Sequence, residues 1–203
     1  MKLQKLLPTL SLSLLLLAGL VVLPGCDNSG SNGPDTTTYT ADLGALNGSG
    51  VTGQATVTVE GDQLTVSVDA EGTVAEQVHA QHIHGGTDGM SSACPTMDAD
   101  SDGNGRISVS EGAPAYGGIL VPLDGSLDNA EGLGDLDTFP VADANGAYAY
   151  DGAIATADLA VNEDRSFGDL SLSDHAIVVH GAVVDGEYKA TLPVACGPLN
   201  LDE

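Results

Sequence analysis

The clearest hydrophobic pattern in the chain is a strict alternation of apolar and polar residues over two neighbouring stretches. Residues Gln54–Glu60 and Gln63–Asp69 each alternate valine, leucine or alanine with threonine, serine or other polar residues. The Gly61–Asp62 pair between them is typical of a two-residue turn. Successive side chains of a strand point to opposite faces. The pattern therefore predicts an antiparallel hairpin with one apolar face.

Several further short runs also favour strands, and glycine- and aspartate-rich turns separate them. No stretch after Val22 shows a sustained helical period. The further runs are Gln77–His84, Gly118–Pro122, Ala147–Asp151, His175–His180 and Tyr188–Val194. Many short strands with turn residues between them predict an all-β domain, an antiparallel sandwich or barrel.

The N-terminus has the pattern of an export signal. Lys2 and Lys5 precede the leucine-rich apolar run Leu6–Val22, and small residues lie just before Cys26. An uncleaved membrane helix is the alternative, but the run contains Pro8 and is short for about 30 Å of hydrocarbon. The sequence Leu23-Pro24-Gly25-Cys26 at the end of the run resembles the bacterial lipobox. The resemblance implies a lipid-modified Cys26.

The sequence therefore predicts a lipoprotein signal peptide over residues 1–25 and a flexible tether over residues 26–38. The tether is rich in glycine, serine, asparagine and proline. A single domain would then span residues 39–203. We expect it to be anchored to a membrane of a bacterial cell envelope, facing the periplasm or the exterior.

The charge balance limits the partners of this domain. The chain has 29 acidic residues against 5 lysines and arginines, a net charge of −24. Without Lys2 and Lys5, only Arg106, Arg165 and Lys189 remain as cations, and the net charge becomes −26 (3 minus 29). Binding of nucleic acid or of anionic lipid headgroups needs clustered basic residues. The composition therefore argues against both as partners.

Cysteine usage fits an oxidising compartment. The chain has 3 cysteines, and lipidation of Cys26 leaves Cys94 and Cys196 as an even pair. The pair forms either one disulfide or two free thiols, and export favours the disulfide.

Residues 100–111 have the spacing of an EF-hand calcium loop. Oxygen donors fall at loop positions 1, 3, 5, 9 and 12, with glycine at 6 and isoleucine at 8. The flanking residues Cys94, Pro95, Gly112 and Pro114 are poor helix formers, so we expect a lone loop inserted in a β-protein. An aspartate-rich turn solvated by water is the alternative. The expected ligands are Asp100, Asp102, Asn104, the carbonyl of Arg106, Ser108 and Glu111.

The 5 histidines form two groups. His79, His82 and His84 lie in one predicted strand, and His175 and His180 lie in another. His82 and His84 would point to the same face, where a histidine of a neighbouring strand can join them. Converging imidazoles suit copper or zinc. Hydrogen-bonded structural histidines are the alternative.

These residues resemble the Cu/Zn superoxide dismutase family in order and spacing. The resemblance rests on His82-Ile-His84, Cys94, Gly168-Asp-Leu170, Asp174-His-Ala-Ile-Val-Val-His180 and Ala195-Cys-Gly197. It covers roughly residues 39–201. It implies a Greek-key β-sandwich, copper ligands His82, His84 and His180, and a Cys94–Cys196 disulfide. The segment Tyr39–Gly85 also resembles chordin-type (CHRD) domains, a second choice that does not explain the C-terminal motifs.

The chain departs from this family where zinc would bind. No histidine lies between His84 and His175, so we expect no zinc site. The copper-only members of the family also lack the zinc region but keep a fourth histidine, for which His79 is the candidate. Pro193 stands where the family has a guiding arginine, and Lys189 is the nearest substitute.

The sequence alone leaves three candidate functions open. The first is a dismutase that converts superoxide to oxygen and peroxide on copper. The second is a protein that holds copper without efficient turnover. The third is a CHRD-like structural or interaction module stabilised by calcium and the disulfide. The strongly negative charge would repel superoxide, which weakens the first. The oligomeric state is open.

Overall fold

The computed structural model describes residues 34–86, 91–128, 134–159, 161 and 166–202. The predicted signal peptide and the predicted lipidation site Cys26 lie outside the described residues. Within them, no helix is both long enough and apolar enough to cross a membrane.

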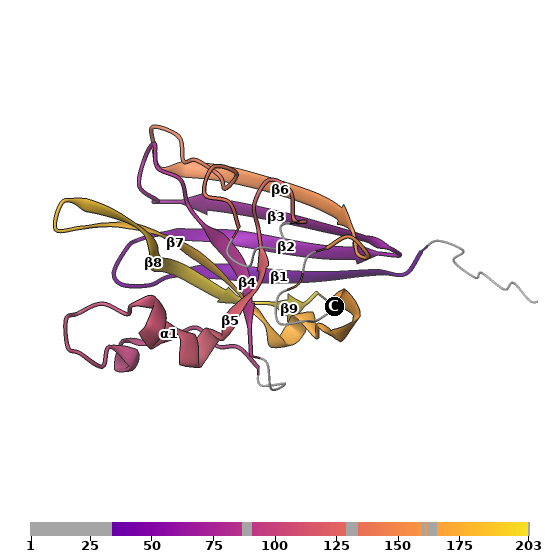
Figure 1. The fold of residues 1–203 in the computed structure, drawn as a ribbon, viewed down its shortest axis with the longest axis horizontal. Helices are drawn as coiled ribbons and strands as arrows, with labels where there is room; N and C mark the ends of the chain where they lie inside the picture. Colours follow the sequence, from indigo (N-terminus) through magenta and orange to yellow (C-terminus); the bar gives the residue numbers. More distant parts are fainter. Residues whose placement is uncertain (1–33, 87–90, 129–133, 160, 162–165, 203) are drawn as a thin grey trace, which may run out of the picture. The chain divides into compact units, whose positions relative to one another are not determined.

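The described part is an all-β domain with short helices in its connections (Figure 1). Its strands are β1 (Thr36–Ala45), β2 (Thr52–Glu60), β3 (Gln63–Glu71), β4 (Gln81–Gly85), β5 (Gly118–Pro122), β6 (Ala147–Ala155), β7 (Ala176–Val184), β8 (Glu187–Pro198) and β9 (Asn200–Leu201). Its helices are α1 (Val109–Tyr116) and the 3₁₀ turns η1 (Met97–Ala99), η2 (Phe167–Asp169) and η3 (Leu172–Asp174).

The strands are antiparallel and follow the order β5-β4-β7-β8-β1-β2-β3-β6, with β9 paired to β1. The strands β1, β2, β3 and β6 lie side by side as one layer, in which the predicted hairpin pairs Glu60 with Gln63 (Figure 1). Only the end of β1, at Gly44 and Ala45, pairs with β8. There the sheet passes into its second layer. The chain crosses between the layers from β3 to β4, from β5 to β6 and from β6 to β7.

The core lies between the two layers. Val57, Leu64 and Val66 of the first layer belong to the same buried cluster as Ile83 and Ile177 of the second. The hairpin strand β3 alternates between this cluster and the surface, as the sequence pattern requires, whereas all five residues of β4 are buried. The predicted antiparallel all-β sandwich is confirmed.

The structure confirms one detail predicted from the sequence and changes two others. The strand β1 begins at Thr36, which pairs with Glu60, so residues 36–38 belong to the sheet and not to the tether. Cys94 and Cys196 form the predicted disulfide, with their Cα atoms 5.6 Å apart. Although Gly112 and Pro114 are poor helix formers, both lie inside the short helix α1.

Local capping and burial explain this short helix. The Ser108 side chain accepts a hydrogen bond from the backbone N–H of Glu111, and the Glu111 carboxylate accepts one from the backbone N–H of Ser108. This reciprocal capping box stabilises a helix N-terminus by about 1 kcal/mol. At the other end, Tyr116 is fully buried and its hydroxyl donates to the Val109 carbonyl. These contacts outweigh the weak helix propensity of the two residues.

Candidate metal centre

Three histidines converge between β4 and β7. His82 and His84 lie two positions apart on β4, so their side chains leave the same face of the strand. The neighbouring strand β7 carries His180 beside them. One potential ligand atom of each ring lies within 4.8 Å of the others. All three residues are buried. The structure thus brings together the three histidines that the sequence predicts as ligands.

The backbone orients two of these rings for metal binding. His84 Nδ1 lies 3.1 Å from the Gly117 carbonyl oxygen, and His180 Nδ1 lies 2.8 Å from that of Thr191. A carbonyl oxygen only accepts hydrogen bonds, so each Nδ1 carries the proton. The Nε2 atoms of both rings therefore carry the lone pair. Both are buried and have no hydrogen-bond partner. This is the arrangement of a metal-ligating histidine with its second nitrogen fixed.

Electrostatics keep these two imidazoles neutral. Burial, and then the neighbouring His180, lower the pKa of His84 from 6.5 to about 3, although the hydrogen bond to Gly117 opposes the shift. Burial, and then His82, lower the pKa of His180 to about 3 as well. Metal ions bind neutral imidazole. At neutral pH both rings therefore have lone pairs ready for an ion.

Aromatic rings surround the three histidines. The ring of Tyr116 meets His84 edge-on at a centroid distance of 4.7 Å, and the ring of Phe139 meets His82 at 5.3 Å. These contacts fix the imidazoles from the sides. The sequence analysis missed Tyr116, Gly117, Phe139 and Thr191, because they come from distant segments with no motif to mark them.

The remaining histidines do not join the group. Both ring nitrogens of His79 lie at hydrogen-bond distance from backbone carbonyl oxygens, 2.9 Å from that of His180 and 3.1 Å from that of Val74. Its ring also stacks on Tyr148. His175 precedes β7, buried and outside the set of converging ligand atoms. The structure thus does not bring the proposed fourth ligand, His79, to the site.

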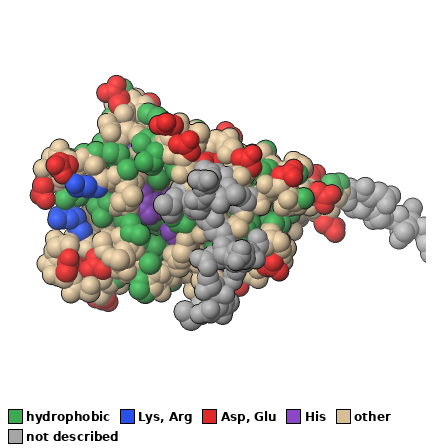
Figure 2. Space-filling model, viewed as in Figure 1, with side chains coloured by type: hydrophobic (Ala, Val, Ile, Leu, Met, Phe, Trp, Pro, Cys, Tyr) green, Lys and Arg blue, Asp and Glu red, His purple; other side chains and the backbone are tan. Residues whose placement is uncertain are grey.

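A cavity of about 640 Å³ opens over the three histidines. In Figure 2 a small area of histidine is visible near apolar side chains, and most acidic side chains lie toward the margin of the view. Most of the lining is apolar. It includes Ala80, Val109, Ala113, Tyr116, Ile119 and Leu136, with Thr191 as a polar residue besides the histidines.

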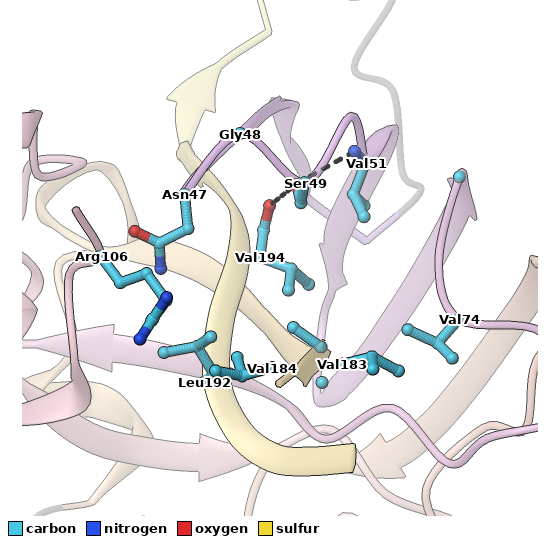
Figure 3. A pocket seen from close by; sticks show the side chains of 13 residues that line it. Asn47, Gly48, Ser49, Val51, Val74, Arg106, Val183, Val184, Leu192 and Val194 are labelled. Carbon is cyan, nitrogen blue, oxygen red and sulfur yellow. Dashed lines mark hydrogen bonds between the residues drawn. The ribbon is translucent and has the colours of Figure 1, made fainter. Parts of the chain in front are cut away.

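The described cations, Arg106 and Lys189, lie elsewhere. Arg106 lines a separate cavity of about 230 Å³, beside Leu192 and Val184 (Figure 3). No residue lines both cavities. Lys189, the expected substitute for the guiding arginine, forms an exposed ion pair with Glu187 at 2.5 Å. Among the described residues that line the histidine cavity, none is charged.

The predicted calcium loop brings its main carboxylates together. Ligand oxygens of Asp100, Asp102 and Glu111 lie within 4.8 Å of one another. The Asp100 carboxylate accepts hydrogen bonds from the backbone N–H groups of Gly103 and Gly105, at 2.9 and 2.7 Å. Gly105 has φ +79°, which permits the sharp turn at loop position 6. Hydrogen bonds from Ser108, then from Ser101, lower the pKa of Glu111 to about 2. Its charge is therefore available for a cation.

Asn47 fastens this loop to the sandwich. The backbone N–H of Ile107 donates to Asn47 Oδ1 at 2.6 Å, and Asn47 Nδ2 donates to the Ile107 carbonyl at 2.9 Å. The same amide donates to the Pro193 carbonyl on β8 at 3.0 Å. This one side chain therefore satisfies both backbone hydrogen-bonding groups of Ile107, a buried residue of the loop. In the sequence, Asn47 followed by Gly48 indicates only a turn, so the contact of Asn47 with the calcium loop was not predicted.

Neither a scan against protein-family models nor a search of curated proteins finds a match to this chain.

Proposed function

We propose that this protein is a copper- and calcium-binding lipoprotein of the cell envelope, similar to superoxide dismutases, with copper held by His82, His84 and His180. The observation that carries the proposal is the convergence of these three buried ligands, two of which present unpartnered Nε2 atoms. A buried polar atom without a partner costs about 1–3 kcal/mol. A bound metal ion would remove that cost, so the residues present fit the ion.

Copper fits the donor set better than the harder cations do. Imidazole suits copper and zinc, whereas calcium and magnesium prefer oxygen ligands. The Greek-key order of the sandwich and the Cys94–Cys196 bridge agree with the resemblance to the dismutase family. A bound copper ion would supply the alternate reduction and reoxidation that turn superoxide into oxygen and peroxide.

In this mechanism the chain's own residues hold and shield the site. The carbonyls of Gly117 and Thr191 keep His84 and His180 in the tautomer that leaves Nε2 free. The ring of Tyr116 packs against His84 and excludes water from that side. The apolar walls lower the local dielectric, which strengthens every interaction at the site.

Calcium in the loop 100–111 would stabilise the wall of the same site. Glu111 is both the expected bidentate ligand at loop position 12 and part of the capping box of α1. The helix ends at Gly117, whose carbonyl accepts the hydrogen bond from His84. A cation that holds Glu111 would therefore also hold α1 and its contacts with the histidines.

A second function, copper holding without efficient turnover, is favoured by the charge distribution. Superoxide is an anion, and fast dismutation uses positive focusing. No charged residue is found in the described lining of the cavity, and the surface is strongly acidic. A CHRD-like interaction module remains the alternative in which no copper is retained. Anchoring through Cys26 rests on the lipobox motif alone.

Copper content and superoxide consumption test these functions together. The exported chain is loaded with copper and calcium, dialysed, and analysed by metal mass spectrometry beside His84→Gln, His180→Gln and the control His79→Gln. We expect about one copper per chain, lost in the first two variants and kept in the control. Superoxide decay measured by pulse radiolysis then separates dismutase from copper-holding protein. Copper that binds no better to the parent chain than to the His84 and His180 variants refutes the copper site.

A further inference from the structure

We propose that the cavity above the three histidines binds a neutral, mainly apolar small molecule whose single nitrogen or oxygen donor reaches the histidine-held metal. The inference rests on the proposed metal site and names the class of ligand that it takes. Superoxide alone does not account for the cavity.

The size of the cavity exceeds what a diatomic anion needs. At about 640 Å³, it lies within the 300–1,000 Å³ range of pockets that enclose organic ligands. A water molecule occupies about 30 Å³ of liquid volume. Water filling such a space would meet mostly apolar walls and make few hydrogen bonds.

The walls select against charge. Val109 and Ala113 of α1 form one side, Ile119 of β5 another, and Leu136 a third. Val109 and Leu136 are also 41% and 51% exposed, unusual for large apolar residues and typical of the rim of a ligand site. An anion in this cavity would lose hydration and meet no positively charged side chain among the described lining residues, so only the ion held by the histidines would attract it.

The polar side chains that line the cavity are those of the three histidines, Tyr116 and Thr191. The Tyr116 hydroxyl already donates to the Val109 carbonyl, so its ring is the part that lines the cavity. The Nε2 atoms of His84 and His180 are buried at the histidine end and lack hydrogen-bond partners. A fitting ligand therefore places one donor atom at this end and an apolar body along α1. Phenols and substituted azoles have this form.

The test uses 4-phenylimidazole, imidazole and azide as probes of the copper-loaded protein. Electron paramagnetic resonance first verifies that copper is bound with nitrogen ligands, and each probe is then titrated. We expect 4-phenylimidazole to bind at least tenfold more tightly than imidazole, because the cavity buries its phenyl ring. Azide is expected to bind more weakly than 4-phenylimidazole. Equal binding of the two azoles, or tightest binding of azide, overturns the proposal.

A matched pair of variants locates the effect. Leu136→Glu places a carboxylate at the cavity rim, whereas Leu201→Glu makes the same change at a leucine of similar exposure, 53%, on β9. Because both leucines are exposed, both variants are expected to fold. Leu136→Glu should abolish the preference for 4-phenylimidazole over imidazole, and Leu201→Glu should keep it. Equal behaviour of the two variants contradicts binding in this cavity.

A chain that binds no copper fails in a distinguishable way. In that case the copper signal is absent from the outset, which refutes the metal site. The cavity is then tested in the metal-free protein by ¹H–¹⁵N nuclear magnetic resonance with 4-phenylimidazole. Shifts confined to amides near Ala113, Tyr116 and Leu136 support the apolar ligand site, and their absence overturns it.

Discussion

Removal of the Cys94–Cys196 disulfide should cost this domain a large share of its stability. The bridge joins the segment that precedes the calcium loop to β8, across a sequence separation of 102 residues. In the chain-entropy model, a loop of this length restricts the unfolded chain by about 5 kcal/mol at 25 °C. Domains of this size are stable by only about 5–15 kcal/mol. The loss would therefore leave little or no net stability.

The surroundings of Cys196 add a second contribution. Cys196 is buried in a cluster with Tyr116, Ala176 and Val178, and Cys94 packs against the same cluster. The double variant Cys94→Ala/Cys196→Ala removes the cross-link, the buried sulfur of Cys196 and the partly buried sulfur of Cys94. The loss of the sulfur atoms adds about 1 kcal/mol of cavity cost. Reduction of the native disulfide removes the cross-link alone, so it separates the two contributions.

Urea unfolding of the domain Pro34–Glu203, followed by circular dichroism, measures both effects. We expect the reduced protein to lose about 4–5 kcal/mol of unfolding free energy and the double variant slightly more. A loss below about 1 kcal/mol upon reduction would refute the reasoning. It would mean that the unfolded chain is already as compact as the cross-linked one.

Three further predictions follow from the site. The substitution Gly117→Ala forces a side chain onto φ +84° and puts its Cβ 2.2 Å from the backbone of Gly85. Because the Gly117 carbonyl orients His84, copper affinity should fall at least tenfold in a competition assay. Unchanged affinity would contradict the role of this carbonyl. Asn47→Ala removes two hydrogen bonds to the calcium loop and should lower the free energy of unfolding by about 2 kcal/mol in thermal unfolding. It should also weaken calcium binding measured by calorimetry. If stability and calcium affinity both match those of the parent protein, Asn47 does not fasten the loop. Because the folded pKa of His84 and His180 is about 3 against 6.5 unfolded, only the unfolded chain takes up these protons between those pH values. Stability of the metal-free protein should therefore fall as pH falls, by about 2 kcal/mol per histidine at pH 5. A His84→Gln/His180→Gln variant should show a flatter dependence, and an equal slope would argue against buried neutral rings.

The sequence predicts the sheet and the ligand histidines because both depend on local periodicity. Alternation from Gln54 to Asp69 specifies which face of the hairpin is buried, whatever packs against it. The His82–His84 pair shares a strand face for the same reason. The choice of His180 over His175 rests instead on the resemblance to the dismutase family, because burial does not alternate on β7 from Ala176 to Gly181.

The environment of the site depends on contacts that no local pattern encodes. The helix α1 forms despite Gly112 and Pro114, because a capping box and the burial of Tyr116 outweigh propensity. The Gly117 carbonyl reaches His84 only after the calcium loop and α1 have folded beside β4. Asn47 meets Ile107 across 60 residues of sequence. Such long-range pairs need the three-dimensional structure.

Anomalous diffraction at the copper edge from crystals soaked in copper tests the central claim most directly. We predict one strong anomalous peak within bonding distance of His82, His84 and His180, and none at His79 or His175. A peak elsewhere on the surface, or none at the three histidines in crystals that demonstrably contain copper, would contradict the metal centre.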